Sequence, residues 1–462
     1  MGNDMVPPDF PPLSNQEVRL VLSRVPSLAA RSASASVVWR SPRPFSATAI
    51  VSLAGVAPGK LSRSSSQCVV VKRHCALARS RASLELEHDF MRHLASGGLQ
   101  VPRVLDDGAC SAWEEGGFVY EAQQVLPGED LYAQAPSWTP YMSQAHAASA
   151  GAALAVLHLA SSSYEQPARP VEPLWASART VSSESPLDEV EELASLLPGL
   201  GEYLRARPGW RKELHQALAP YHEAFLPYAG ELRPLWCHND WHPSNLLWAQ
   251  SAQQCGASPE KVAATPAPAP PATSAPAPPA TAARTSANGT VTKEAARAGQ
   301  RSGHSSEPRQ FERKAPAEPA GEVAGAVAAG EVAGVIDFSL ANLTSALYDL
   351  ATALERSVVP WLEQPDRRRA NLGQADALLE GYCSVRPLSP SEAQALGRLL
   401  PLVHVDYALS EIDYFVRVAR SAANANLAWG SYLLGHLRWW ATPPGRHLLS
   451  NVAARLSSHT VP

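Results

Sequence analysis

The segment CHNDWHPSNLLW (residues 237–248) holds a histidine, an aspartate and an asparagine in the spacing H-x-D-x-x-x-x-N. Catalytic loops that transfer phosphoryl groups use this spacing, because the aspartate accepts the proton of the attacking hydroxyl and the asparagine turns back to hold a magnesium ion. Taken singly, Asp240 would cap a helix or turn, and His242 would be a surface side chain. Their combination and order favour the catalytic interpretation.

A second acid, Asp337, stands at the end of the apolar segment VAGVIDF, where the second metal ligand of such a site is expected. Between the two motifs, residues 250–330 are dominated by Pro, Ala, Thr, Ser and Gly, which cannot bury enough apolar surface to offset chain entropy. We therefore predict a disordered insertion there. The flanking segments, NLLW from Asn245 and VAGVIDF from Val332, are predicted to pair as a hairpin that brings Asn245 and Asp337 together.

With the further element YDLA at residues 348–351, these motifs resemble those of the aminoglycoside phosphotransferase and choline kinase family. The resemblance extends over nearly the whole chain apart from the insertion and the extreme N-terminus. It implies a two-lobed protein-kinase-like fold, ATP and Mg2+ as cofactors, and transfer of the γ-phosphoryl group to a hydroxyl of a small molecule. By this resemblance, the site consists of the catalytic base Asp240, the magnesium ligands Asn245 and Asp337, and the supporting residues His238 and Asp349.

In the N-terminal part, Lys72 ends the apolar run CVVVK, where a kinase places the lysine that pairs with the α- and β-phosphates. On its own it would be an ordinary strand-end lysine in solvent. Its partner acid is expected from the helix at about residues 79–95, where Glu85 and Glu87 compete. Glu87 shares a helical face with apolar residues and Glu85 lies on the polar side, so we predict that Glu87 is the partner.

The nucleotide site departs from the protein-kinase pattern at one point. No G-x-G-x-x-G motif occurs; the corresponding stretch is RSPRPFSATA from Arg40. The candidate phosphate contacts in this stretch are Ser41, Arg43 and Ser46. By the resemblance, backbone groups around Gln124 and Val125 form the adenine-binding hinge between the lobes.

The pattern of the remaining segments predicts an α+β fold. Short β-branched runs beginning at Val37, Ala47 and Cys68 are typical of strands, whereas most of the chain beyond residue 125 has helical periodicity. Capping boxes at Ser14 and Ser389 predict two helix starts. We expect a small β-rich N-terminal lobe (residues 1–124) and a large α-rich C-terminal lobe (residues 125–462) that residues 250–330 interrupt.

The composition excludes several classes of protein. With 39 basic and 43 acidic residues the net charge is -4, so no overall field would attract nucleic acid or an anionic membrane. The six cysteines form no C-x-x-C pair, which indicates free thiols in a reducing compartment. No export signal or spanning segment is found, and we expect a cytoplasmic protein.

The acceptor is the least determined feature. Asp349 follows Asp337 by only twelve residues with no A-P-E element, so the activation segment that would dock a peptide is missing and a small-molecule acceptor is favoured. His404, Glu411 and Asp406 could meet a polyol or an amine. Trp429, His436 and Trp440 share one helical stripe and suit either an ammonium cage or an ordinary aromatic core. His158 is most simply a helix residue with satisfied hydrogen bonds.

Two alternatives stay open on the same scaffold: a protein Ser/Thr kinase, and a nucleotide-binding pseudokinase that acts as an interaction module. The insertion at residues 250–330 could bind a protein partner, or it could be a neutral expansion.

Overall fold

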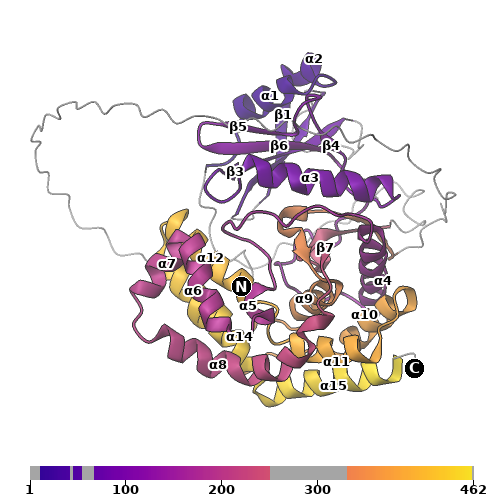
Figure 1. Ribbon diagram of the computed structural model, residues 1–462. Helices are drawn as coiled ribbons and strands as arrows, with labels where there is room; N and C mark the ends of the chain where they lie inside the picture. Colours follow the sequence, from indigo (N-terminus) through magenta and orange to yellow (C-terminus); the bar gives the residue numbers. More distant parts are fainter. Residues whose placement is uncertain (1–10, 42–44, 55–66, 250–329, 460–462) are drawn as a thin grey trace, which may run out of the picture. The chain divides into compact units, whose positions relative to one another are not determined.

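The N-terminal lobe is built on an antiparallel sheet whose strands are rich in β-branched residues. The computed structural model describes residues 11–41, 45–54, 67–249 and 330–459, and in it the strand order is β1-β2-β3-β6-β4, with β5 also paired to β6 (Figure 1). The strands are β1 (Ser36–Arg40), β2 (Ala47–Ser52), β3 (Cys68–Cys75), β4 (Val104–Leu105), β5 (Ala112–Glu115) and β6 (Phe118–Gln124). The predicted insertion lies outside the described residues except for its last one, Gly330.

Three helices accompany this sheet: α1 (Asn15–Arg24), α2 (Ala29–Ser32) and α3 (Arg81–Ser96). The predicted capping box at the start of α1 is present, since Ser14 Oγ accepts from the Glu17 N–H at 3.2 Å and the Ser14 N–H donates to Glu17 at 2.8 Å. The buried face of α3 includes Leu84, Glu87 and Phe90. One helix therefore carries a buried carboxylate among apolar side chains.

The C-terminal part is mostly helical, which confirms the predicted α+β fold with a β-rich and an α-rich lobe (Figure 1). Its helices are α4 (Gln144–Ser161), α5 (Arg179–Ser182), α6 (Pro186–Leu196), α7 (Pro198–Arg205), α8 (Trp210–Phe225), α9 (Ala346–Val358), α10 (Leu372–Val385), α11 (Pro390–Leu399), α12 (Val405–Arg417), α13 (Ala422–Leu427), α14 (Leu434–Trp440) and α15 (Pro443–His459). The capping box of α11, Ser389 with Glu392, is also present.

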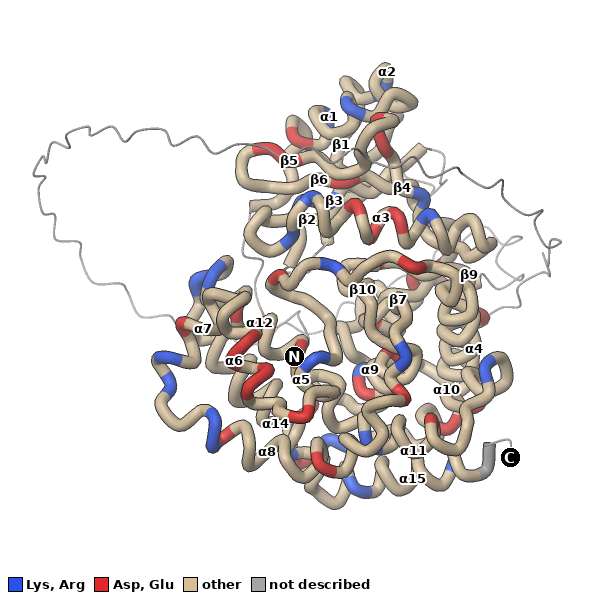
Figure 2. Tube along the Cα trace, viewed as in Figure 1, with Lys and Arg blue, Asp and Glu red and all other residues tan. Residues whose placement is uncertain are grey.

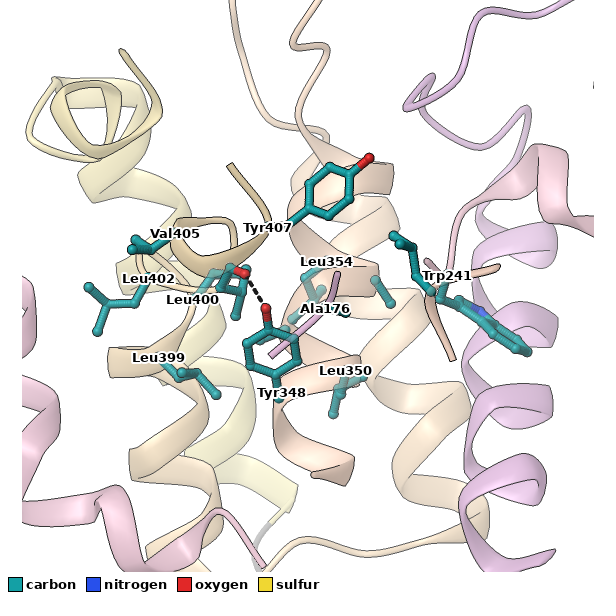
Figure 3. Packing of buried hydrophobic residues seen from close by; sticks show 14 of the residues in the cluster. Ala176, Trp241, Tyr348, Leu350, Leu354, Leu399, Leu400, Leu402, Val405 and Tyr407 are labelled. Atoms are coloured by element: carbon teal, nitrogen blue, oxygen red, sulfur yellow. Dashed lines mark hydrogen bonds between the residues drawn. The ribbon is translucent and has the colours of Figure 1, made fainter. Parts of the chain in front are cut away.

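Helix α9 forms the centre of this lobe. Every one of its residues is buried, and its apolar side chains pack with Leu399, Leu402 and Val405 from neighbouring elements (Figure 3). Tyr348 donates from its hydroxyl to the carbonyl of Val403 at 2.6 Å, which satisfies a polar atom inside this core. Because α9 is buried all round, the charged residues that it carries must find their partners inside the protein.

The C-terminal part also contains two short antiparallel strand pairs. Strand β7 (Leu235–Cys237) pairs with β10 (Asn342–Thr344), and β8 (Leu246–Trp248) pairs with β9 (Val332–Val335). The second pair confirms the predicted hairpin, with Leu246 opposite Val335. The loop that carries the H-x-D-x-x-x-x-N motif runs from β7 to β8.

Charges are distributed over both lobes. Basic and acidic side chains are interspersed along the described chain (Figure 2), so the small net charge arises from intermingled rather than segregated charges. Among the described helices, none is both long enough and apolar enough to cross a bilayer.

Helices α4 and α10 approach each other through two glycines. A Cβ added to Gly151 of α4 would overlap the carbonyl oxygen of Leu378, and one added to Gly381 of α10 would overlap that of Ala148. The same two helices are joined by a buried hydrogen bond, in which His158 Nδ1 of α4 lies 2.8 Å from the Tyr382 hydroxyl of α10.

We expect Gly381→Ala to lower the free energy of unfolding by about 1–3 kcal/mol or more, because the methyl group forces the two backbones apart. Urea unfolding followed by circular dichroism measures the change. Gly397→Ala in α11 is the matched control, since no described atom outside its own stretch of helix lies within 4 Å of the added Cβ. It should be neutral or stabilise by about 0.4–1 kcal/mol. Equal midpoints for the two variants would contradict the assigned close contact.

Candidate active site

The loop between β7 and β8 is held by one buried carboxylate. Asp349, in the first turn of α9, accepts from the backbone N–H of His238 at 3.0 Å and from that of Asn239 at 2.9 Å. Its position near a helix N-terminus also favours a negative charge. The loop is therefore tied to α9 through its own backbone.

A histidine and a tyrosine hold this carboxylate in turn. His158 Nε2 lies 3.2 Å from Asp349 Oδ2, and His158 Nδ1 lies 2.8 Å from the Tyr382 hydroxyl. Because the carboxylate can only accept, Nε2 carries the proton and Nδ1 accepts from the tyrosine. Burial lowers the pKa of His158, so the ring is neutral. His158 is a satisfied helix residue, as the sequence indicated.

The predicted supporting residue His238 bridges the loop and the strand before Asp337. Its Nε2 lies 3.0 Å from the carbonyl of Ile336, and its Nδ1 accepts from the Asp240 N–H at 3.2 Å. The ring therefore fixes the backbone of Asp240 relative to the segment that leads to Asp337.

Two residues of the site adopt left-handed backbone conformations without being glycine: Asn239 and Asp337, each with φ of 60°. Such conformations cost energy and persist where surrounding contacts enforce them. The Asn239 amide donates to the carbonyls of Cys237, Leu340 and Asn342 at 3.2 Å each, which enforces the turn. Sequence reasoning missed Asn239, although asparagine is one of the few residues that tolerate this conformation.

Asp240 is held from two sides. The Asn245 amide donates to the Asp240 carbonyl at 2.9 Å and to Oδ2 at 3.0 Å, while Arg356 forms an ion pair with Oδ1. His242 Nε2 lies 3.5 Å from the same Oδ1. Burial would raise the pKa of Asp240, but the charge of Arg356, with a smaller contribution from His242, lowers it well below its ordinary value. Asp240 is therefore ionised.

Arg356 was not anticipated from the sequence. It extends from α9, donates to the carbonyl of Asn239 at 3.2 Å, and lies over the rings of Trp138 and Tyr407 at 5.2 and 5.1 Å. These contacts enclose its charge between a carboxylate and two aromatic faces. The sequence signal for it was the charged pair Glu355-Arg356 near the end of a mostly apolar helix.

Lys72 of β3 reaches across to the C-terminal part and contacts Asp337, with Nζ 3.2 Å from Oδ1. Burial would lower the pKa of Lys72, but the negative charges of Asp337, Glu121 and Glu87 raise it above its ordinary value. For Asp337, burial acts to raise the pKa and Lys72 lowers it. The side chain of Lys72 is 10% exposed and that of Asp337 is 43% exposed. Solvent therefore reaches this ion pair at the carboxylate of Asp337.

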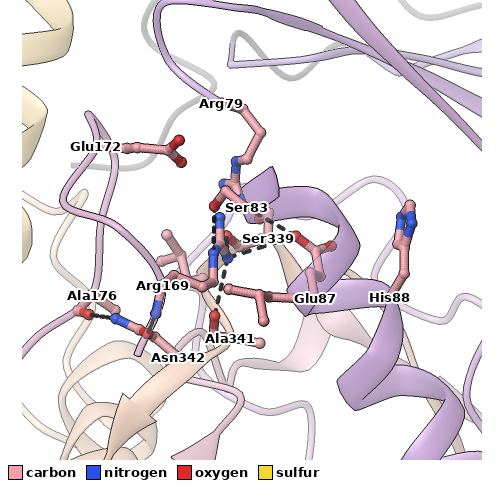
Figure 4. A network of polar contacts seen from close by, with 12 residues as sticks. Arg79, Ser83, Glu87, His88, Arg169, Glu172, Ala176, Ser339, Ala341 and Asn342 are labelled. Carbon is pink, nitrogen blue, oxygen red and sulfur yellow. Dashed lines mark hydrogen bonds and ion pairs between the residues drawn. The ribbon is translucent and has the colours of Figure 1, made fainter. Parts of the chain in front are cut away.

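The predicted Lys72–Glu87 ion pair is not found among the described residues. Glu87 is the buried acid of α3, as expected, but its Oε2 lies 3.0 Å from Arg79 and 3.6 Å from Arg169 (Figure 4). Glu85, the alternative, accepts from the backbone of residues 111 and 112. Two arginines thus hold the Glu87 carboxylate, and Lys72 pairs with Asp337 instead.

Arg169 connects this carboxylate to the segment that follows Asp337. Its guanidinium donates to Ser83 Oγ at 2.8 Å and to the carbonyls of Ser339 and Ala341 at 2.9 and 3.0 Å (Figure 4). Helix α3 is therefore coupled to the chain beyond the metal-ligand candidate.

Glu121 of β6 is a further buried acid that sequence reasoning missed. It lies opposite Lys72 in the β3–β6 register and contacts His74 and His88, each at 2.9 Å. Burial would raise the pKa of Glu121, but Lys72 and the two histidines lower it well below its ordinary value. An acid in the middle of an apolar strand was the available signal.

The other residues predicted for the nucleotide site lie at the end of β6 and before β2. Gln124 is exposed at the end of β6, and its backbone N–H donates to the carbonyl of Arg103 at 2.8 Å. Val125 is half-buried. Ser46 Oγ lies 3.1 Å from Thr48, and Arg43 lies outside the described residues.

The residues suggested for binding the phosphoryl acceptor differ in whether they have hydrogen-bond partners within the protein. Asp406 accepts from the N–H of Thr180 through both oxygens, and the Trp429 indole donates to Glu213 at 3.1 Å, so both have structural partners. Glu411 is buried, and its Oε2 has no hydrogen-bond partner among the described residues.

Three solved structures are similar to the chain over most of its length. An aminoglycoside phosphotransferase from Alicyclobacillus acidocaldarius subsp. acidocaldarius DSM 446 is 15% identical, with 91% of this chain and 93% of that chain covered and a TM-score of 0.43. The amicoumacin kinase hAmiN, in complex with AMP-PNP, Ca2+ and Ami, is 11% identical over 92% of this chain and 96% of its own, with a TM-score of 0.46. The spectinomycin phosphotransferase APH(9)-Ia, with ADP and spectinomycin, is 10% identical over 91% and 92%, with a TM-score of 0.39.

The model of the phosphotransferase enzyme family matches residues 61–257. No curated protein matches the sequence significantly. The matched range includes Lys72, Glu121 and the whole loop from His238 to Asn245. The family resemblance inferred from the motifs is thereby confirmed.

The role of Asp349 as the anchor of the loop can be tested by Asp349→Asn. The amide keeps the shape but leaves one backbone N–H facing an NH2 group, so we expect the free energy of unfolding to fall by about 1–3 kcal/mol in urea titrations. Asp188→Asn, which removes a surface ion pair with Arg211, is the control and should change it by less than about 1 kcal/mol. An Asp349→Asn variant as stable as this control would exclude the anchoring role.

Proposed function

We propose, from the family match and the geometry of the site, that this phosphotransferase moves the γ-phosphoryl group of ATP to a hydroxyl of a small molecule that is aminoglycoside-, amino-alcohol- or sugar-like. One observation carries the proposal: residues from both lobes converge on a single pair of carboxylates. Lys72 lies 3.2 Å from Asp337, and Asn245 lies 3.0 Å from Asp240.

The donor set suits magnesium. Asn245 uses its NH2 group on Asp240, which leaves its amide oxygen available, and Asp337 offers a partly exposed carboxylate. Magnesium prefers oxygen ligands and keeps several waters and phosphate oxygens in its shell, so one carboxylate and one amide are sufficient. Asn245 and Asp337 would hold the ion, which when bound neutralises charge on the phosphate oxygens.

Each of the site residues then has a defined role. Lys72 presents a buried positive charge beside Asp337, where it would bind the phosphates. Asp240 orients the acceptor hydroxyl and takes its proton. Asn245 and Arg356 fix the Asp240 carboxylate, so its orientation is set before the acceptor arrives.

The short connection after Asp337 supports a small acceptor. A single helical turn (Phe338–Leu340) and β10 fill the chain between Asp337 and the start of α9, so this stretch has no free loop on which a peptide could dock. Tyr407 lies beside Arg356, and Glu411 follows Tyr407 by four residues on the same face of α12. We assign the acceptor side of Asp240 to this part of α12.

Nucleotide binding is tested by thermal unfolding with ATP, in the presence and absence of magnesium. At a hundredfold excess over the dissociation constant, ATP with magnesium should stabilise the wild type by about 2.7 kcal/mol, because the ligand binds only the folded chain. The magnesium-dependent part should be lost in Asp337→Asn and kept in Asp188→Asn. Absence of any shift with nucleotide in the wild type would refute the proposed function and favour an interaction module.

Catalysis is tested by Asp240→Asn, after screening of amino alcohols, aminoglycosides and sugars for acceptor-dependent ADP release. We expect turnover to fall by a factor of about 10² to 10⁴ because the general base is removed. The ATP-dependent thermal shift should remain, which shows that the nucleotide site is intact. Turnover within a few-fold of the wild type would exclude Asp240 as the base.

A further inference from the structure

A second cluster of potential metal ligands lies in the helical lobe. Glu355 belongs to α9, His404 directly precedes α12, and His436 belongs to α14. All three are at most 3% exposed, and one ligand atom from each lies within 4.8 Å of the other two. None of them belongs to the predicted magnesium ligands.

The orientation of His404 is fixed by a backbone carbonyl. Its Nε2 lies 3.0 Å from the oxygen of Leu433, and because a carbonyl only accepts, Nε2 carries the proton. Nδ1 is then a lone-pair acceptor, and it is buried without a hydrogen-bond partner among the described residues. Histidines that bind metals are typically oriented in this way, with the second ring nitrogen donating to a carbonyl or carboxylate.

Glu355 also has a buried acceptor atom without a hydrogen-bond partner. Its Oε1 lies 2.8 Å from His436 Nδ1, but its Oε2 is buried with no partner in the described part of the chain. A carboxylate oxygen and an imidazole lone pair therefore share one buried cluster, and both are acceptors. Two buried acceptors without a donor are costly, and a cation between them would remove that cost.

In a second cluster of similar composition, the acceptor atoms are hydrogen-bonded. His158, Cys237 and Asp349 also bring ligand atoms within 4.8 Å of one another. There, both ring nitrogens of His158 are bonded and both Asp349 oxygens accept backbone N–H groups. The protein satisfies these acceptors itself, so of the two clusters found among the described residues it is the one around Glu355 that calls for a bound ion.

We propose that Glu355, His404 and His436 form a site for a transition-metal ion of the Zn2+ type. Two imidazoles and one carboxylate are a common ligand set for such ions, whereas Mg2+ prefers oxygen donors throughout. If His436 coordinates through Nδ1, the metal replaces its hydrogen bond to Glu355.

The surroundings are compatible with an added cation. Arg356, the next residue after Glu355, carries a positive charge, but Asp240 pairs with it. Tyr432 packs against both histidine rings, at 5.5 and 4.8 Å between centroids, and its buried hydroxyl has no hydrogen-bond partner among the described residues. The ion would link α9, α14 and the start of α12.

The test uses the full chain after treatment with a chelator. Titration with Co2+ should produce visible absorption bands that saturate and are displaced by Zn2+, and equilibrium dialysis should give one tightly bound Zn2+ per chain. His404→Gln and His436→Gln should each weaken Zn2+ binding by at least about 100-fold, since even indirect supports of a metal site are worth 10–100-fold. His215→Gln, an exposed histidine of α8, and Asp337→Asn should bind as the wild type does.

Zinc X-ray absorption of the loaded wild type gives a reading that does not depend on the folding of any variant. Two imidazole ligands without sulfur are expected. The proposal is overturned if the wild type binds no Zn2+, if the two histidine variants bind it unchanged, or if the spectrum shows thiolate ligation. Because no nucleotide is present, these outcomes are independent of the ATP experiments.

Discussion

The buried carboxylate of Asp349 is the constraint on which the site depends. It accepts from two consecutive backbone N–H groups of the loop, and together with the side-chain amide of Asn239 it holds the left-handed turn at that residue. A buried charge is stable only when its hydrogen bonds are complete, so His158 must be neutral and correctly oriented. The close approach of α4 and α10 through glycine serves that requirement, because it brings His158 and Tyr382 into contact.

Much of the fold could be predicted because its signals are local. Each capping box depends on two residues within four successive positions, and the β8–β9 hairpin was predicted from two apolar segments despite the long intervening chain. Asn245 and Asp337 were expected together for the same reason. Arg356 could not be placed, since its partner Asp240 is 116 residues away and no spacing rule connects a helix interior to a distant loop.

The partner of Lys72 illustrates a different limit. Helical periodicity identified Glu87 as the buried acid of α3, which the structure bears out. Periodicity gives the face of a helix but not the competing charges around it. Arg79 and Arg169 take Glu87, and Arg169 comes from an irregular segment whose position no pattern indicated. The choice among partners of a buried charge is decided by tertiary structure.

Helix α9 has a consequence for how this chain can change in evolution. One buried helix carries the loop anchor Asp349, the partner of Asp240, and Glu355, so a shift of its axis displaces all three together. Substitutions at these positions should be strongly non-additive, since they act through one rigid element. The same holds for α12 at Tyr407, because its ring packs against Arg356, which in turn holds Asp240 and the carbonyl of Asn239.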